Sequence, residues 1–162
     1  MQTKLINEMI AYEEGVPQRI HHFLKVYGFA KTIGVLEVLD AETQQILEAA
    51  AIVHDIGIRP SLEKYGSDAG PYQEREGVAP AHSMLSACGY SPAVVERVCY
   101  LVAHHHTYRD MDGVDYQILV EADFLVNLYE GNASSAAIRS AYEHVFRTET
   151  GKRFCRQLFF KV

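Results

Sequence analysis

The stretch that decides the fold reads Ala50-Ala51-Ile52-Val53-His54-Asp55-Ile56-Gly57. An apolar helical run ends there in an adjacent imidazole and carboxylate, followed by a glycine. The small and apolar side chains of this run lead along one helical face to His54, which places the His54-Asp55 pair at the buried end of a helix. We expect Gly57 to take the left-handed backbone position that commonly follows a helix end. A buried acid beside a histidine is unfavourable unless both are paired, and a divalent metal ion would pair with both.

Length and composition predict one ordinary globular unit. The chain has 162 residues, of which 48% are hydrophobic and 22% charged, so a single domain over residues 1–162 can bury one core. The formal net charge of −6 disfavours a polyanion such as duplex nucleic acid as the main partner. It leaves room for a local basic pocket that binds a small phosphate.

Cysteine usage and hydropathy favour a cytoplasmic protein. Cys88, Cys99 and Cys155 are odd in number and lack the spacing of a metal site, which is typical of reduced thiols. No apolar run approaches the roughly 18 residues that a membrane-spanning helix needs, and no segment has the pattern of a signal peptide.

Hydrophobic periodicity predicts an all-α fold. No internal repeat is present, and no segment alternates with period two. We expect residues 56–72, rich in Gly, Pro, Ser and Asp, to form a long loop with at most one short helical turn. Helices are expected over residues 2–13, 17–39, 41–55, 73–88, 92–105, 114–130, 132–148 (or from 134) and 151–160.

Helical phase separates inward-facing histidines and acids from their neighbours. His22 continues the apolar stripe of residues 26, 29, 30 and 33, whereas His21 lies on a more polar face. His105 continues the apolar stripe of its helix, although His104 or His106 would replace it if that helix ends early. Asp123 is spaced to face the interior between apolar residues 119 and 126.

Each of these residues alone has an ordinary explanation, such as a hydrogen-bonded core histidine or a capping aspartate. Their coincidence on the apolar faces of three separate helices favours a metal site instead. Two imidazoles and two carboxylates suit a divalent Mn, Fe, Co, Ni, Zn or Mg ion. The histidines disfavour calcium, and the lack of nearby cysteines disfavours a closed structural zinc site.

The order of these residues resembles a known signature. The chain is similar to the H…HD…D pattern of the HD superfamily of metal-dependent phosphohydrolases in Arg19-x-x-His22-x-x-x-Val26, Val53-His54-Asp55-Ile56-Gly57 and Glu121-Ala122-Asp123. The resemblance covers residues 17–130. It implies an HD-type bundle of about five core helices plus short flanking helices, with residues 132–162 packed on it. It also implies four metal ligands, namely His22, His54, Asp55 and Asp123.

Some members of the family hold a second metal through two further histidines. His105 resembles the second of these. Counting back along the preceding helix places Glu76 at the position of the first, and His82, the nearest histidine, falls out of phase. The sequence therefore favours one ion over two, with Glu76 and His105 as the candidate ligands of a second.

The function that the resemblance implies is hydrolysis of a phosphoester, such as a nucleotide or another small phosphate. Asp55 is the expected residue to orient or deprotonate the attacking water. Protonated His105, or Arg59 and Lys64 from the expected loop, would neutralise charge on the phosphate or leaving group.

Two other functions stay open at this point. Some proteins of the same fold oxidise carbon–hydrogen bonds at a di-iron centre, a chemistry that needs six ligands and that Glu76 disfavours. The domain could also be a non-catalytic module that binds a metal or nucleotide. A homo-oligomer is a further option, because the aromatic tail of Phe154, Phe159 and Phe160 can pack on the bundle or on a partner.

Overall fold

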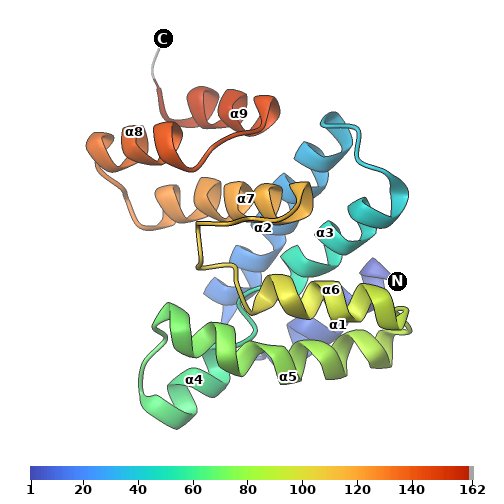
Figure 1. The fold of residues 1–162 in the computed structure, drawn as a ribbon. Helices are drawn as coiled ribbons and strands as arrows, with labels where there is room; N and C mark the ends of the chain where they lie inside the picture. Colours follow the sequence, from blue (N-terminus) through green and yellow to red (C-terminus); the bar gives the residue numbers. More distant parts are fainter. Residues whose placement is uncertain (161–162) are drawn as a thin grey trace.

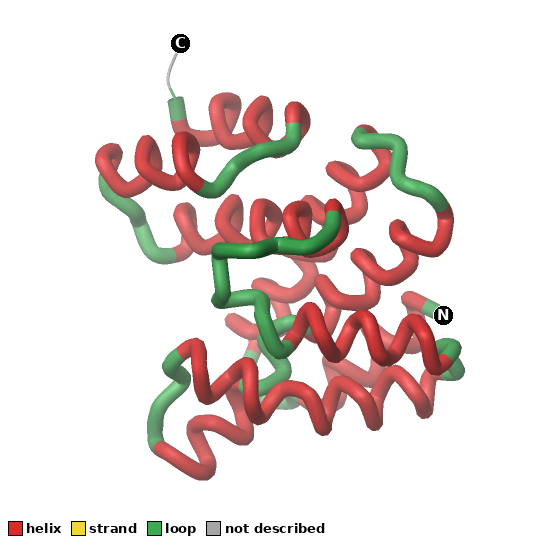
Figure 2. Tube along the Cα trace, viewed as in Figure 1, coloured by secondary structure: helices red, strands yellow, loops and turns green. Residues whose placement is uncertain are grey.

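The protein is entirely helical over the part of the chain that the structure, a computed structural model, describes, residues 1–160. Figure 2 shows no strand in this range, which confirms the all-α prediction. None of the helices in residues 1–160 is long and apolar enough to span a bilayer. The described helices are α1 (Gln2–Tyr12), α2 (Pro17–Leu36), α3 (Ala41–Val53), α4 (Ile58–Tyr65), α5 (Gly70–Cys88), α6 (Pro92–Val102), α7 (Val114–Glu130), α8 (Ser135–His144) and α9 (Glu149–Phe159).

Five helices form the bundle, and α3 lies at its centre. Helix α3 packs against α2, α6 and α7, helix α2 also packs on α7, and α5 pairs with α6. Every residue of α3 from Leu47 to Val53 is buried, as expected for a helix covered on all sides. Helix α4 packs on α5 at one end of the molecule, and at the other end α9 packs on α7 and α8 packs on α9 (Figure 1). The aromatic tail packs on the chain itself, through the pairs Phe29–Phe154 and Tyr142–Phe160.

Local signals account for the helix starts. The side chain of Asp40 accepts hydrogen bonds from two backbone N–H groups of the first turn of α3. Ser91 and Ser134 accept in the same way at the starts of α6 and α8, as N-cap residues do. Asp40 and Ser91 therefore cap α3 and α6, and Ser134 rather than Asn132 caps α8.

The segment expected as a loop, residues 56–72, is mostly helical. It contains α4 and the first turn of α5. Pro60 and Pro71 lie in the first turns of these helices, where a missing N–H removes no hydrogen bond. Gly66 has φ 63° and ends α4 in the left-handed conformation. The residues that suggested a loop therefore delimit two helices.

Three helices end three or four residues earlier than predicted. Helix α8 stops at His144 rather than near residue 148. Helix α2 stops at Leu36 rather than near residue 39, and Val38 has φ 59°. Helix α6 stops at Val102 rather than His105, so His104, His105 and His106 lie in the turn that follows it.

Gly57 has a different role from the one expected. Its backbone is right-handed, with φ −72° and ψ −14°, so the predicted left-handed position is wrong. A Cβ atom at Gly57 would lie 2.2 Å from the carbonyl oxygen of Gln73 and 2.8 Å from the backbone nitrogen of Gly77. A glycine is required because the turn after α3 approaches the backbone of α5, directly beside Asp55.

We predict that Gly57→Ala destabilises the fold by about 1–3 kcal/mol, as overpacking of a closed interior does. Gly28→Ala is the matched control, because Gly28 lies inside α2 with no atom within 4 Å of an added Cβ. That change should be neutral or stabilising by up to about 1 kcal/mol. Urea denaturation measures both, and equal stabilities of the two variants would refute the close approach at Gly57.

Candidate metal centre

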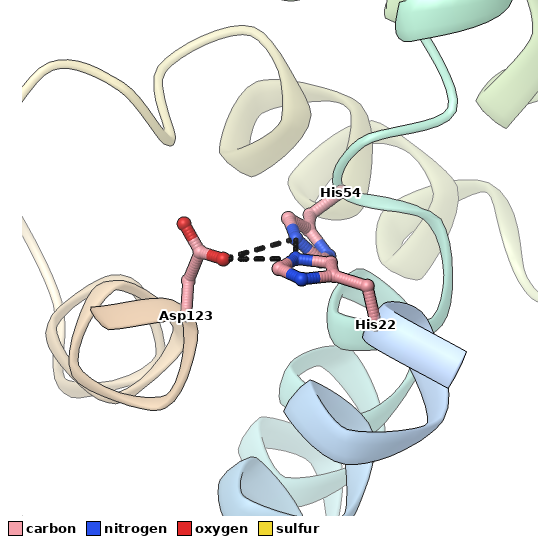
Figure 3. A group of neighbouring side chains, drawn as sticks. All are labelled: His22, His54 and Asp123. Atoms are coloured by element: carbon pink, nitrogen blue, oxygen red, sulfur yellow. Dashed lines mark hydrogen bonds and ion pairs between the residues drawn. The ribbon is translucent and has the colours of Figure 1, made fainter. Parts of the chain in front are cut away.

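Three segments far apart in the sequence meet at the centre of the bundle. His22 comes from α2, His54 and Asp55 from the turn that ends α3, and Asp123 from α7. Figure 3 shows the two imidazole rings facing the carboxylate of Asp123. His54 is fully buried, and His22 and Asp123 are 8% and 3% exposed. The predicted convergence of these side chains is therefore present.

The donor atoms are spaced as ligands of one ion. His22 Nε2 lies 3.3 Å from His54 Nε2, 3.1 Å from Asp123 Oδ1 and 3.4 Å from Asp55 Oδ2. His54 Nε2 lies 3.4 Å from Asp123 Oδ1 and 3.5 Å from Asp55 Oδ2. Ligand atoms about 2.0–2.2 Å from a common cation are about 3.0–3.5 Å from one another in octahedral or tetrahedral arrangements. The residues present fit a divalent metal ion.

The outer nitrogens of both histidines are occupied. His22 Nδ1 lies 2.8 Å from Glu130 Oε2, and His54 Nδ1 lies 3.0 Å from the carbonyl oxygen of Ala51. Because both acceptors take a proton from Nδ1, each Nε2 atom can offer its lone pair to a metal ion when it carries no proton of its own. Hydrogen bonds of this kind fix the tautomer of metal-ligating histidines.

The charges of the cluster hold its carboxylates ionised. Burial opposes the charged form of Asp55, but His54 and His105 outweigh it and lower its pKa to about 2. Burial likewise opposes ionisation of Asp123, whose pKa is nevertheless lowered by its hydrogen bonds with His22 and His54. Burial disfavours the protonated form of His22, yet the neighbouring carboxylates raise its pKa to about 9. A proton therefore occupies the cluster when no metal does.

His105 is a cationic neighbour of Asp55. Its Nε2 lies 2.9 Å from Asp55 Oδ1, and its Nδ1 lies 2.8 Å from the carbonyl oxygen of Val102. Since both ring nitrogens face acceptors, the ring carries two protons. Burial opposes this charge, but the hydrogen bond with Asp55 raises the pKa of His105 above its usual range. The inward phase predicted for His105 is confirmed, since it is 1% exposed.

The turn that carries His105 is hydrogen-bonded to a side chain of α7. The hydroxyl of Tyr116, a buried residue at the start of α7, lies within hydrogen-bond distance of the carbonyl oxygens of His104 and Thr107. These two residues flank His105 and His106, so α7 positions this turn as well as Asp123.

A second group of polar side chains lies beside the first. His106 Nε2 is 3.9 Å from Asp55 Oδ1 and 3.2 Å from Gln73 Oε1. Asp55, His105 and His106 together offer three donor atoms close enough to share an ion. Sequence reasoning missed Gln73, although steps of four residues back from Leu85 through Ala81 and Gly77 reach it, and all of these are buried.

Glu76, the expected partner of His105 at a second ion, lies elsewhere. Its carboxylate pairs with Lys64 and accepts a hydrogen bond from the hydroxyl of Tyr65 at 2.8 Å. These contacts lower the pKa of Glu76 to about 2. The structure therefore does not bring Glu76 or Lys64 to the cluster.

Arg59 is also turned away from the cluster. Its guanidinium donates to the carbonyl oxygen of Tyr12 and lies over the ring of the same residue. Two histidines that the sequence set aside, His21 and His82, are exposed, in agreement with their phase.

Arg19, rather than Arg59, lines a cavity beside the metal centre. A cavity of about 230 Å³ opens onto His22 and Asp55 and is lined by Gln18, Arg19, His22, Phe23, Asp55, Ile58, Asn127 and Glu130. Arg19 Nε lies 2.7 Å from Oε2 of Glu13, a fully buried residue. Within residues 1–160 the terminal nitrogens of Arg19 make no hydrogen bond. Glu13 thus fixes a cation whose outer nitrogens remain available at the cavity.

The comparisons with known proteins agree with this geometry. The HD domain family matches residues 19–148, which is most of the chain. A crystal structure of a "predicted HD superfamily hydrolase" from an uncultured Thermotogales bacterium has the same fold, with a TM-score of 0.68 and 23% sequence identity over 97% of this chain and 84% of that one. The search of curated proteins gives no significant match.

The family match includes all four clustered donors, His22, His54, Asp55 and Asp123. It supports a metal-dependent hydrolase in general terms. The resemblance first seen in three short motifs is thereby confirmed, and the chain belongs to the HD domain family.

Proposed function

We propose that the protein is a metal-dependent phosphohydrolase that acts on a phosphoester, either a nucleotide or another small phosphate. The observation that carries the proposal is that the Nε2 atoms of His22 and His54 lie 3.3 Å apart, and each lies 3.1–3.5 Å from a carboxylate oxygen of Asp55 and one of Asp123. Membership of the HD domain family supports hydrolysis as the reaction.

The residues favour a single ion as the working unit. The four donors form a complete mixed N/O set, suited to Mn²⁺, Fe²⁺, Co²⁺, Ni²⁺, Zn²⁺ or Mg²⁺. In the adjoining group an amide, Gln73, faces His106 where a charged or imidazole ligand would be needed for a strong second site. This arrangement also disfavours a di-iron oxygenase, which requires a full second set of ligands.

The chemistry divides between the ion and the chain. A divalent cation in this set supplies Lewis acidity toward a phosphoryl oxygen and toward water. Asp55 is ionised at neutral pH, and its Oδ1 is fixed by His105, so the carboxylate can orient and accept a proton from an attacking water. His105 carries the opposite charge and can stabilise the leaving oxygen or donate a proton to it.

Substrate phosphate would be held by Arg19. The Nε atom of its guanidinium pairs with Glu13, and Arg19 lines the same cavity as His22 and Asp55. An arginine presents paired N–H groups that match phosphate oxygens. The small cavity, about 230 Å³, supports a small phosphoester.

We predict that Asp55→Ala lowers metal-dependent phosphatase activity by about 10²-fold or more, because it removes both a metal donor and the proton acceptor. Circular dichroism should show an intact helical fold. Glu143→Ala, at an exposed site on α8, is the control and should retain full activity. Assays with generic phosphomonoesters and cyclic diesters under several divalent metals measure the effect. Undiminished activity of metal-stripped Asp55→Ala would rule out the mechanism.

A second prediction separates Arg19 from the cations expected from sequence. Arg19→Met should raise KM for a phosphoester by about 10-fold or more, because a hydrogen bond to a charged group is lost. Lys64→Met should leave KM unchanged, since Lys64 pairs with Glu76. Steady-state kinetics of the two variants decide between the residues, and the reverse ranking would contradict the assignment.

The stability of the metal-free protein should depend on pH through His22. Its folded pKa of about 9 lies above its ordinary value of 6.5, so its contribution is fully present below pH 6.5 and is lost as pH rises through 9. The thermal midpoint of the apoprotein should fall from about pH 6 to about pH 8.5, and the stabilisation by added Mn²⁺ should grow over the same interval. Differential scanning fluorimetry tests both trends. In His22→Ala the stabilisation by Mn²⁺ should disappear and the pH slope of the apoprotein should become shallower, with the remainder due to His105, whose pKa is also raised. An unchanged slope there would assign the effect elsewhere.

A further inference from the structure

One contact of the metal centre extends to the protein surface. Each carboxylate oxygen of Glu130, at the end of α7, contacts a different residue of α2. Oε2 lies 2.8 Å from His22 Nδ1, and Oε1 lies 2.6 Å from Nζ of Lys25. Lys25 follows His22 by three residues on α2, so both side chains are on the same face of that helix. The result is an unbroken chain from Lys25 through Glu130 to His22 that joins α2 to α7.

The two histidines of the centre differ in what holds them. His54 Nδ1 is bound by the backbone carbonyl of Ala51, inside its own helix, and no side chain takes part. His22 Nδ1 depends on a carboxylate that is 108 residues distant in the sequence and whose side chain is 30% exposed. The Nδ1 partner of His22 can therefore be removed by substituting a side chain outside the donor set, whereas that of His54 cannot.

We propose that Glu130 and Lys25 are positioning residues of the metal centre, with Glu130 fixing the ring and tautomer of His22 and Lys25 fixing Glu130. The proposal rests on the proposed function, because it assumes that His22 binds a metal ion. It assigns a role to two residues that supply no donor atom to the ion.

The tautomer argument supports Glu130. Without an acceptor at Nδ1, the proton of neutral His22 can reside on either nitrogen, and the form protonated at Nε2 points N–H toward the cation. Glu130 removes that form from the population. A hydrogen-bonded carboxylate also makes the imidazole a stronger donor.

The charge at the cavity mouth supports Lys25. Glu130 lines the same cavity as Arg19, so an unpaired carboxylate there would repel an incoming phosphate. The ammonium of Lys25, at 2.6 Å, neutralises this charge and draws the second oxygen away from the cavity. Lys25 itself does not line the cavity but faces the outer groove between α2, α7 and α9.

Metal titration by calorimetry tests the assignment, with Mn²⁺ as the probe and activity left aside. Glu130→Ala should weaken Mn²⁺ binding by about 10- to 100-fold, as loss of a carboxylate behind a ligating histidine does. Glu130→Gln keeps an acceptor oxygen and should fall between Glu130→Ala and wild type. Lys25→Met should weaken binding less than Glu130→Ala.

A double-mutant cycle distinguishes positioning from a surface ion pair. If Lys25 acts through Glu130, Lys25→Met should have no further effect on Mn²⁺ affinity in the Glu130→Ala background. Lys31→Met, on the same helix but paired with Tyr27, is the control and should bind as wild type does. Thermal melts of each variant verify folding, and Lys25→Met changes only a half-exposed side chain.

The outcomes separate the two proposals. Wild-type affinity in both Glu130→Ala and Lys25→Met would overturn the positioning role and leave the metal centre standing. If Lys25→Met changed Mn²⁺ affinity equally in the wild-type and Glu130→Ala backgrounds, the conclusion that Lys25 acts through Glu130 would be overturned. A wild-type protein that binds no divalent cation would overturn the proposed function, and this inference with it.

Discussion

Mutual repulsion among the donor atoms is the constraint on which the site depends. Two imidazole Nε2 atoms lie 3.3 Å apart and share their surroundings with two ionised carboxylates, in the interior of a helical bundle. Such a group is costly to bury unless a positive charge compensates it. Protons on His22 and His105 do so in the metal-free protein, and a divalent cation would do so at the donor atoms themselves. The bundle holds the donors in place because each lies on a packed helix or directly at its end.

The turn after α3 places Asp55 between the metal ligands and His105. The helix ends at Val53, and His54 and Asp55 lie in the turn that follows it. Asp55 can then face the cluster with one oxygen and His105 with the other. The close approach of Gly57 to α5 fixes this turn. The same approach brings Gln73 near the turn that carries His106, so a packing requirement of the backbone determines which residues surround the centre.

Sequence periodicity was sufficient to predict which residues of the regular helices face the interior. The phases of His22 and Asp123 and the all-α architecture follow from apolar spacing alone. His105 is buried as predicted, although α6 ends before it and a turn rather than a helix carries it. Residues whose roles depend on distant partners could not be found in this way. Glu130 reaches His22 across 108 positions, and Glu13 fixes Arg19 from a different helix. Arg59 and Lys64 were placed near the substrate because residues 56–72 were expected to be a loop, whereas α4 commits both to other partners. Glu76 was selected by counting back from Ala81 and Leu85, whereas four-residue steps from the same two residues lead to Gln73.

The central claim is that one cation is shared by donors from α2, the α3 turn and α7. A crystal structure of the protein with bound Mn²⁺, located by anomalous scattering, tests it most directly. The account predicts one strong anomalous peak within bonding distance of His22, His54, Asp55 and Asp123. A peak held by other residues, or crystals grown with saturating Mn²⁺ that show none at this position, would contradict it.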